Sequence, residues 1–146
     1  MGYYGIRERK MIKRNTVQKM KIMEFLMSTN CHPTAEVVYA EVSKDIPTIS
    51  LSTVYRNLNT MAEEGDIIKF EVGNEAHFDA DTSFHHHAYC KCCNVVFDVY
   101  DDEISRYITK NANISNFKIE ATNLIFLGKC GHCSGDCISE SEIAQL

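Results

Sequence analysis

The chain has 146 residues, 45% of them hydrophobic, and a formal net charge of −5 at pH 7. This length suits one or two small domains, and the apolar content is enough for packed cores. No apolar run approaches the roughly 20 residues of a membrane span. The first residues are charged rather than apolar, so we expect a cytoplasmic protein with no membrane partner.

Acidic and basic residues are unevenly divided along the chain. Residues 1–76 carry ten basic and ten acidic residues, whereas residues 77–146 carry five basic and ten acidic ones. Residues 1–21 hold seven basic residues, Arg14 among them, against Glu8 alone. This asymmetry favours a front that faces a polyanion, with Arg14 as a candidate DNA contact, although a solvated arm has the same composition.

Apolar spacing predicts two helices near the start of the chain. The first helix ends near Ser28 and presents one apolar face, formed by Val17, Met20, Ile22, Met23, Phe25 and Leu26. Pro33 and Thr34 open the second helix, which covers residues 35–45 before Pro47 ends it.

A third helix is predicted over residues 53–64. Either Ser50 or Ser52 is its N-cap, and Gly65 supplies the left-handed residue that follows its last turn. Its buried stripe consists of three residues at helical spacing, Val54, Leu58 and Met61.

A hairpin follows the third helix, because residues 66–72 and 76–80 flank Gly73-Asn74-Glu75. Three helices and a hairpin describe a winged helix-turn-helix, whose last helix lies in the DNA major groove. Hydroxyl and guanidinium side chains around the third helix are of the types that reach phosphates and base edges: Ser50, Ser52, Thr53, Tyr55 and Arg56. An ordinary polar helix face shows the same pattern.

The second half is predicted as a separate α/β unit. Residues 95–99 and 119–127 form strands, with a helix over residues 101–112 between them. Such a short sheet leaves an apolar face uncovered, so we expect a second copy of the chain to cover it in a homodimer. The expected fold is α+β, with a winged-helix DNA-binding domain at 1–80, a hinge at 81–84 and a metal-binding dimerisation domain at 85–146.

Four cysteines form two Cys-x-x-Cys pairs, Cys90/Cys93 and Cys130/Cys133, with 36 residues between the pairs. Paired thiolates of this kind are typical of a closed, structural Zn²⁺ site, whereas reduced buried cysteines are the simpler alternative. Two further cysteines are not needed for four-coordination and are expected to be spectators, Cys92 and Cys137.

Imidazole and carboxylate groups indicate a second, harder site that suits Fe²⁺, Mn²⁺ or Zn²⁺. His85 and His87 lie two residues apart, so in an extended segment both rings project to one face and His86 to the other. Asp79 and Asp98 provide oxygen ligands. His32, just before the second helix, is a further candidate ligand, although a histidine before proline is more often an ordinary loop residue.

The chain resembles the ferric uptake regulator superfamily from about Thr16 to Cys133, in the motifs His32-Pro33-Thr34-Ala35, Ser52-Thr53-Val54-Tyr55-Arg56-Asn57-Leu58, His85-His86-His87-x-x-Cys90-x-x-Cys93 and Cys130-x-x-Cys133. The resemblance implies a dimeric, metal-dependent repressor that binds palindromic operator DNA, and not an enzyme. It carries over a regulatory Fe²⁺ or Mn²⁺ site of His32, Asp79, His85, His87 and Asp98. It also carries over a structural zinc site of Cys90, Cys93, Cys130 and Cys133.

Within this family, the chain resembles the peroxide-sensing branch in having an aspartate at position 98, where iron-uptake regulators usually carry Glu. The function implied is a repressor that senses peroxide through oxidation of its own histidines. At Arg56, in contrast, the chain resembles the iron-uptake branch, so the alternative function is an iron-uptake regulator that uses Fe²⁺ as co-repressor. Zinc-uptake regulation ranks third, because the usual ligands of an auxiliary site are not evident at Phe84, His86 and Thr122.

Two other classes would use the same metal ligands. A metalloenzyme needs an open coordination position and a general base, and no Glu or Ser is partnered for that role. A metal store or chaperone has no need of a basic arm or a recognition-type helix.

Overall fold

The computed structural model describes residues 16–134. Arg14 and Cys137 therefore lie outside the described residues. The chain divides into two units, Met1–Thr82 and Ser83–Leu146, and the division falls inside the segment expected to be the hinge. Among residues 16–134, no helix combines the length and the apolar character that a membrane span requires.

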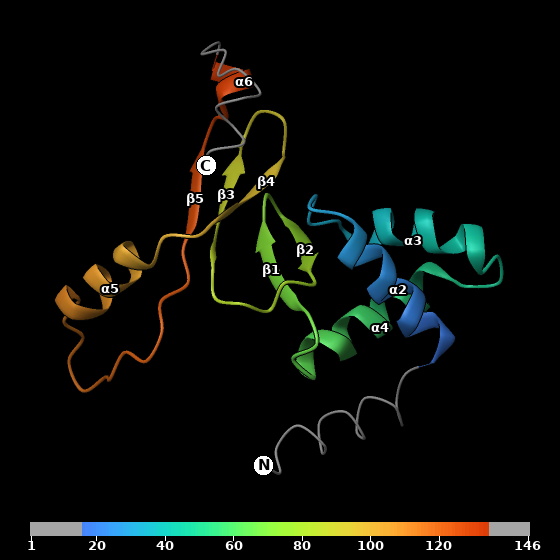
Figure 1. Ribbon diagram of the computed structural model, residues 1–146, viewed down its shortest axis with the longest axis horizontal. Coiled ribbons are helices and arrows are strands. Elements are labelled where there is room, and N and C mark those ends of the chain that lie inside the picture. The colour runs from blue at the N-terminus through green and yellow to red at the C-terminus, as the bar shows by residue number, and fades with distance from the viewer. Residues whose placement is uncertain (1–15, 135–146) are drawn as a thin grey trace. The chain divides into compact units, whose positions relative to one another are not determined.

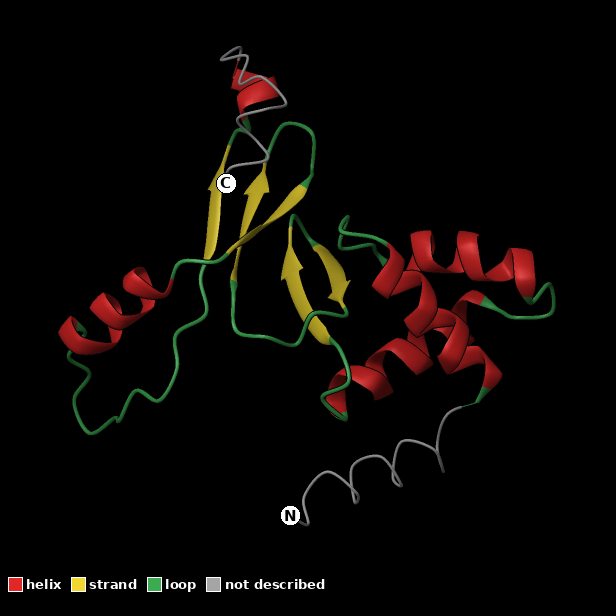
Figure 2. Ribbon diagram, viewed as in Figure 1, coloured by secondary structure: helices red, strands yellow, loops and turns green. Residues whose placement is uncertain are grey.

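Three helices and a hairpin make up the described part of the N-terminal unit (Figures 1 and 2). The helices are α2 (Val17–Ser28), α3 (Ala35–Asp45) and α4 (Leu51–Glu63), and the strands are β1 (Ile68–Val72) and β2 (Glu75–Asp79). Ser50 is the N-cap of α4, because its hydroxyl accepts a 3.1 Å hydrogen bond from the Thr53 N–H. The helix therefore starts two residues earlier than expected. This is the predicted order of a winged helix-turn-helix.

The core of this unit is built from one stripe of each helix together with residues of the hairpin, and it comprises Ile22, Leu26, Ala35, Val38, Val42, Ile49, Val54, Leu58, Met61, Ile67 and Phe78. The expected apolar face of α2 was partly wrong, because Val17 and Met20 are 68% and 58% exposed. At about 100° per residue, both lie on the opposite side of the helix from Ile22.

The hairpin turn is shorter than expected. Gly73 and Asn74 have φ angles of +62° and +64°, and Glu75 is already paired with Val72 in the ladder. Two consecutive left-handed residues are typical of a two-residue type I′ turn, whose twist matches that of the flanking strands. The turn fixes the register that places Phe70 opposite His77.

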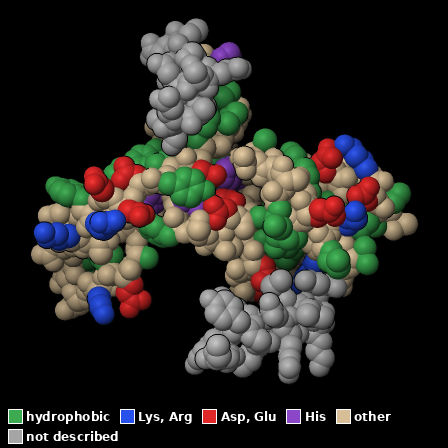
Figure 3. Space-filling view, viewed as in Figure 1, with side chains coloured by type: hydrophobic (Ala, Val, Ile, Leu, Met, Phe, Trp, Pro, Cys, Tyr) green, Lys and Arg blue, Asp and Glu red, His purple; other side chains and the backbone are tan. Residues whose placement is uncertain are grey.

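Charges on the N-terminal unit are mixed rather than of one sign. Acidic and basic side chains lie side by side over α3 (Figure 3), where Lys44 pairs with Glu41 at 2.7 Å and Lys21 pairs with Asp45 at 3.2 Å. The expected polyanion-facing front therefore rests on the basic run at residues 1–21, of which 1–15 are outside the described part.

A three-stranded sheet is the centre of the C-terminal unit. β3 (His86–Cys90) lies between β4 (Val96–Val99), which is antiparallel to it, and β5 (Ile125–Gly128), which is parallel to it. Two helices complete the described part of this unit, α5 (Asp102–Asn111) and α6 (Gly131–Ser134).

The strand predicted at residues 119–127 is confirmed only at its end. β5 begins only at Ile125, where it pairs with His87 of β3. Before that residue, the backbone of β3 contacts the preceding segment through one hydrogen bond of 3.1 Å, from the His87 N–H to the Leu124 carbonyl. Residues 119–123 therefore have no strand partner and form an irregular segment. The predicted helix at 101–112 is present, and the Asp101 carboxylate caps it by accepting from the N–H groups of Glu103 and Ile104.

Candidate metal centres and DNA-facing helix

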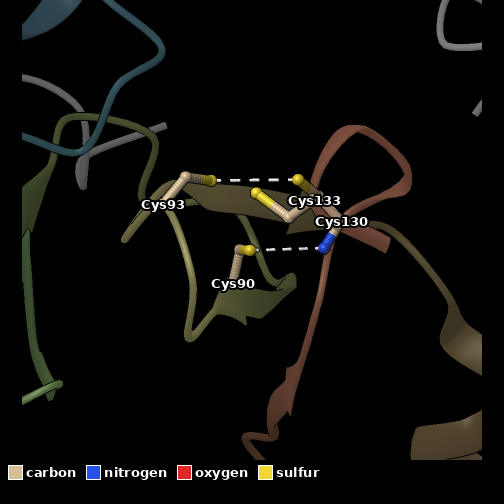
Figure 4. Close-up of side chains that lie close together, drawn as sticks. All are labelled: Cys90, Cys93, Cys130 and Cys133. Atoms are coloured by element: carbon tan, nitrogen blue, oxygen red, sulfur yellow. Dashed lines mark hydrogen bonds between the residues drawn. The ribbon is translucent and has the colours of Figure 1, made fainter. Parts of the chain in front are cut away.

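The two Cys-x-x-Cys pairs meet because β3 and β5 are parallel neighbours. Cys90 ends β3 opposite Gly128, and the Lys91 N–H donates a 2.8 Å bond to the Gly128 carbonyl, so the two chain segments leave the sheet together. Cys93 follows in the turn after β3, whereas Cys130 directly precedes α6 and Cys133 lies within it. Figure 4 shows the four cysteine side chains gathered at this end of the sheet.

The spacing of the sulfur atoms fits a tetrahedral ion. All four Sγ atoms lie within 4.8 Å of one another, and those of Cys93 and Cys130 are 3.8 Å apart. Four sulfurs bound at about 2.3 Å around Zn²⁺ would be about 3.8 Å apart. The residues present therefore fit a structural zinc ion.

Hydrogen bonds and crowding shift the pKa values of Cys90 and Cys133 in opposite directions. The backbone N–H of Cys130, at 3.3 Å from the Cys90 sulfur, and then that of Cys93 lower the pKa of Cys90 to about 6. The thiols of Cys130 and then Cys92 raise the pKa of Cys133. The Cys90 thiolate thus forms readily while the Cys133 thiol retains its proton, and a divalent cation would favour the thiolate form of both.

Cys92 and Cys31 are exposed and lie outside this group of four. Cys92 nevertheless lies close enough to Cys133 to raise its pKa, so the spectator role of Cys92 stays a prediction.

A second cluster lies on the same sheet, where the β3/β4 register pairs His87 with Asp98. One Asp98 carboxylate oxygen lies 3.0 Å from Nε2 of His85 and 3.6 Å from Nε2 of His87. Both imidazoles are fully buried, and the carboxylate is 24% exposed. Two nitrogen atoms and one oxygen atom that could bind a metal ion therefore lie close together.

The tautomer of His85 makes this point suitable for a cation. Nδ1 of His85 lies 2.8 Å from the Ser83 carbonyl, which can only accept, so Nδ1 carries the proton. In the neutral ring the lone pair of Nε2 then faces the Asp98 oxygen. Two acceptors at 3.0 Å attract each other only with a proton or a metal ion between them.

The N-terminal unit contributes a separate histidine and carboxylate pair. Nε2 of His32, immediately before Pro33, lies 3.2 Å from an Asp79 oxygen at the end of β2, and both side chains are at least nine-tenths buried. The other Asp79 oxygen accepts a 2.8 Å bond from the Asp81 N–H, which fixes the carboxylate. Each unit thus holds part of the expected regulatory ligand set.

His86 lies on the opposite face of β3, as the alternation of the strand requires, and has a structural role. Its Nδ1 accepts a 3.1 Å bond from the Leu124 N–H, so its Nε2 carries the proton and donates to the Ser105 hydroxyl on α5. Both ring nitrogens are satisfied, and the ring is fully buried. The sequence placed His86 on this face but did not reveal its partners.

The DNA-facing candidates lie on and beside α4. Ser50 is engaged as the cap, and its hydroxyl also contacts those of Ser52 at 3.1 Å and Thr53 at 2.8 Å. Tyr55 and Arg56 are exposed, whereas the stripe with Val54 and Leu58 is fully buried. The helix therefore presents hydroxyl groups at its N-terminus and a phenol and a guanidinium one turn later.

The chain matches the model of the ferric uptake regulator family over residues 10–127, which is more than half of its length. It is 32% identical over 122 residues to the peroxide operon regulator of Bacillus subtilis, which covers 83% of this chain and 84% of that protein. Among solved structures, the fold is similar to that of the Helicobacter pylori ferric uptake regulator Fur, with a TM-score of 0.77, 22% identity and coverage of 92% and 91% of the two chains. It is also similar to the ferric uptake regulator from Pseudomonas aeruginosa with manganese, with a TM-score of 0.67, 26% identity and coverage of 84% and 96%. The chain therefore belongs to the ferric uptake regulator family, whose members are dimeric DNA-binding regulators and not enzymes.

Proposed function

We propose that this metal-responsive regulator is a repressor whose binding to a palindromic operator is switched by Fe²⁺ or Mn²⁺ at His32, Asp79, His85, His87 and Asp98, and that it senses peroxide. The observation that carries the proposal is the contact between Nε2 of His85 and the Asp98 carboxylate at 3.0 Å, which requires a proton or a metal ion between the two atoms. Imidazole and carboxylate ligands suit Fe²⁺ and Mn²⁺.

A separate structural zinc ion is proposed at Cys90, Cys93, Cys130 and Cys133. Thiolates suit Zn²⁺, and the 3.8 Å sulfur separation supports this ion. It would hold the segments after β3 and β5 together at the end of the sheet. The two sites thus differ in ligand chemistry, and only the nitrogen and oxygen site is proposed to exchange its metal.

The proposed switch joins the two units. His32 and Asp79 belong to the winged-helix unit, whereas His85, His87 and Asp98 belong to the other one, and residues 81–84 connect them. If one ion is held by both sets, the angle between the two recognition helices of a dimer is fixed before DNA binds. In the metal-free protein the hinge would be ordered only when DNA binds, and the free-energy cost of this ordering would weaken DNA binding.

The C-terminal unit provides a surface for the second copy of the chain. β5 has β3 as its only partner strand among the described residues, and its apolar side chains are exposed, with Leu127 at 63% and Phe126 at 40%. Phe97 on β4 is also 41% exposed. An apolar edge strand of this kind requires a cover, which the partner protomer supplies in the proposed dimer.

Peroxide sensing rests on Asp98 and on the similarity to the Bacillus subtilis peroxide operon regulator. Bound Fe²⁺ would supply the one-electron chemistry that turns H₂O₂ into an oxidant of a neighbouring imidazole. His32 and His85 are the expected targets, and the oxidised ring gains one oxygen. A site with a lost ligand no longer holds its metal, and the DNA is released.

The test is a gel shift with the zinc-loaded protein and added Fe²⁺, Mn²⁺ or Zn²⁺, followed by stoichiometric H₂O₂. We expect Fe²⁺ and Mn²⁺ to promote operator binding, and peroxide to abolish it in the Fe²⁺ form alone. Binding that needs no added metal would contradict the switch.

A second candidate function is iron-uptake regulation with Fe²⁺ as co-repressor. Arg56 favours it, because this exposed side chain on α4 stands where iron-uptake regulators commonly have arginine. In that case peroxide leaves the Fe²⁺ form bound to DNA. Zinc-uptake regulation ranks after it.

A further inference from the structure

His32 has an unusual backbone conformation. Its φ is +49°, and the three other non-glycine residues with positive φ in the described part of the chain are all asparagines, Asn74, Asn94 and Asn116. Non-glycine residues are uncommon in this region, although asparagine and histidine tolerate it better than most. A residue before proline is further restricted to extended conformations, and His32 precedes Pro33. Other groups must therefore hold His32 in place.

One of these groups is His77 on β2. Its Nδ1 lies 2.8 Å from the His32 carbonyl, and both residues are buried, with exposures of 6% and 4%. A carbonyl only accepts, so Nδ1 of His77 carries the proton and donates it. This bond fixes the peptide group that links His32 to Pro33.

Phe70 supports the same arrangement from β1. Its ring stacks on that of His77, with centroids 5.7 Å apart and an interplanar angle of 16°, and contacts His32 edge-on at 5.9 Å. The hairpin register places Phe70 directly opposite His77. The two rings thus hold His32 from the hairpin side.

Packing alone does not explain a histidine at this position. Nε2 of His77 is buried and has no hydrogen-bond partner among the described residues. Burying an unpaired polar atom is unfavourable, and a phenylalanine would fill the same space against Phe70 without that cost. The feature that phenylalanine lacks is the donor to the His32 carbonyl.

We infer that His77 is a positioning residue for the regulatory metal, which acts by holding His32 in its left-handed conformation with Nε2 toward Asp79. The inference rests on the proposed role of His32 as a ligand. Groups that orient metal ligands typically change metal affinity about 10- to 100-fold when they are removed. His77 thereby sets how tightly the exchangeable metal is held, without binding it.

Two matched variants of the full-length, zinc-loaded protein test this inference by titration with Mn²⁺. His77→Phe keeps the stacked ring and removes the donor, whereas His77→Asn removes the ring and keeps an N–H donor the same number of bonds from Cβ. We expect Mn²⁺ to bind about 10- to 100-fold more weakly to the Phe variant, and the Asn variant to recover most of this loss. Zinc content and the melting temperature of the Phe variant should stay close to those of the parent.

Unchanged Mn²⁺ affinity in the Phe variant would overturn the inference, as would equal losses in both variants. In the parent protein, nitrogen NMR should show His77 protonated at Nδ1, and protonation at Nε2 alone would also overturn it. His32→Ala serves as the reference. If that variant binds Mn²⁺ normally, the proposed ligand set is wrong, and this failure is distinct from a failure of His77.

Discussion

The Tyr55 hydroxyl on α4 donates a 2.5 Å hydrogen bond to the Glu36 carboxylate on α3. This bond is the main cause that lowers the pKa of Glu36 and raises the pKa of Tyr55 above its ordinary value of 10.0. Because the pKa of Glu36 is lowered, its carboxylate stabilises the fold at pH values above the ordinary carboxyl pKa. This stabilisation is lost as the pH falls through the pKa of the folded state. Because the pKa of Tyr55 is raised, its phenol stabilises the fold at pH values below 10.0, and this stabilisation is lost as the pH rises through the pKa of the folded state. The contact is therefore complete at neutral pH.

Glu36→Gln should lower the pKa of Tyr55 toward 10.0, because the amide accepts the hydrogen bond without a negative charge. Carbon NMR of labelled tyrosine follows the titration of the individual rings. Glu41→Gln on the same helix is the control, since Glu41 pairs with Lys44. Identical Tyr55 titrations in the parent and in Glu36→Gln would show that this contact is not formed in solution.

The DNA face is tested by removing its two exposed side chains. Tyr55→Ala and Arg56→Ala should each weaken operator binding by about 1 to 3 kcal/mol, because base and phosphate contacts of these types have that magnitude. Fluorescence anisotropy with operator DNA measures the loss, while metal content and the dimer should be unchanged. Lys44→Ala, on the exposed surface of α3, is the matched control. Full affinity in both variants would place the recognition surface elsewhere.

The zinc site is tested with serine variants. Because a four-thiolate zinc site contributes on the order of 10 kcal/mol to folding, Cys90→Ser or Cys133→Ser should unfold the C-terminal unit or dissociate the dimer. Cys92→Ser is the control and should retain one zinc per chain. Sedimentation and metal analysis report both outcomes. A stable, zinc-free dimer of either ligand variant would refute the assignment.

Much of the N-terminal unit could be predicted from local signals. The 35–45 helix, bounded by Pro33 and Pro47, and the α4 stripe with Val54 and Leu58 follow from capping and periodicity. The exposed side of α2 could not be predicted, because apolar residues run around most of that helix. Burial there depends on which side faces α3 and α4.

The site was predictable as a set of ligand types but not as an arrangement. The alternation of β3 correctly separated His86 from His87, and the ring of His85, just before the strand, lies 4.7 Å from that of His87. His77 carried no signal, because a single histidine in a strand does not reveal that its ring faces a distant carbonyl. The His86 contacts with Ser105 and Leu124 were hidden for the same reason, since they join segments far apart in the sequence.

The choice between peroxide and iron sensing turns on Asp98. Its carboxylate oxygen lies 3.0 Å from Nε2 of His85 and 3.6 Å from Nε2 of His87, so a side chain one methylene longer must seat a shared ion differently. We expect Fe²⁺ protein treated with stoichiometric H₂O₂ to gain one oxygen on the peptide that bears His32 or His85 and to lose DNA binding. In the Mn²⁺ form the histidines should stay unoxidised and DNA binding should persist, because Mn²⁺ in these ligands does not reduce peroxide.

Asp98→Glu is the discriminating variant. It should reduce the oxidation of His32 and His85 while metal-dependent DNA binding persists, because the longer carboxylate still offers an oxygen but changes the position that peroxide can reach. Peptide mass spectrometry and gel shifts on the same samples measure both properties. If no oxidised histidine is found in the parent protein while Fe²⁺ still drives DNA binding, peroxide sensing is excluded. The iron-uptake function that Arg56 favours then takes its place.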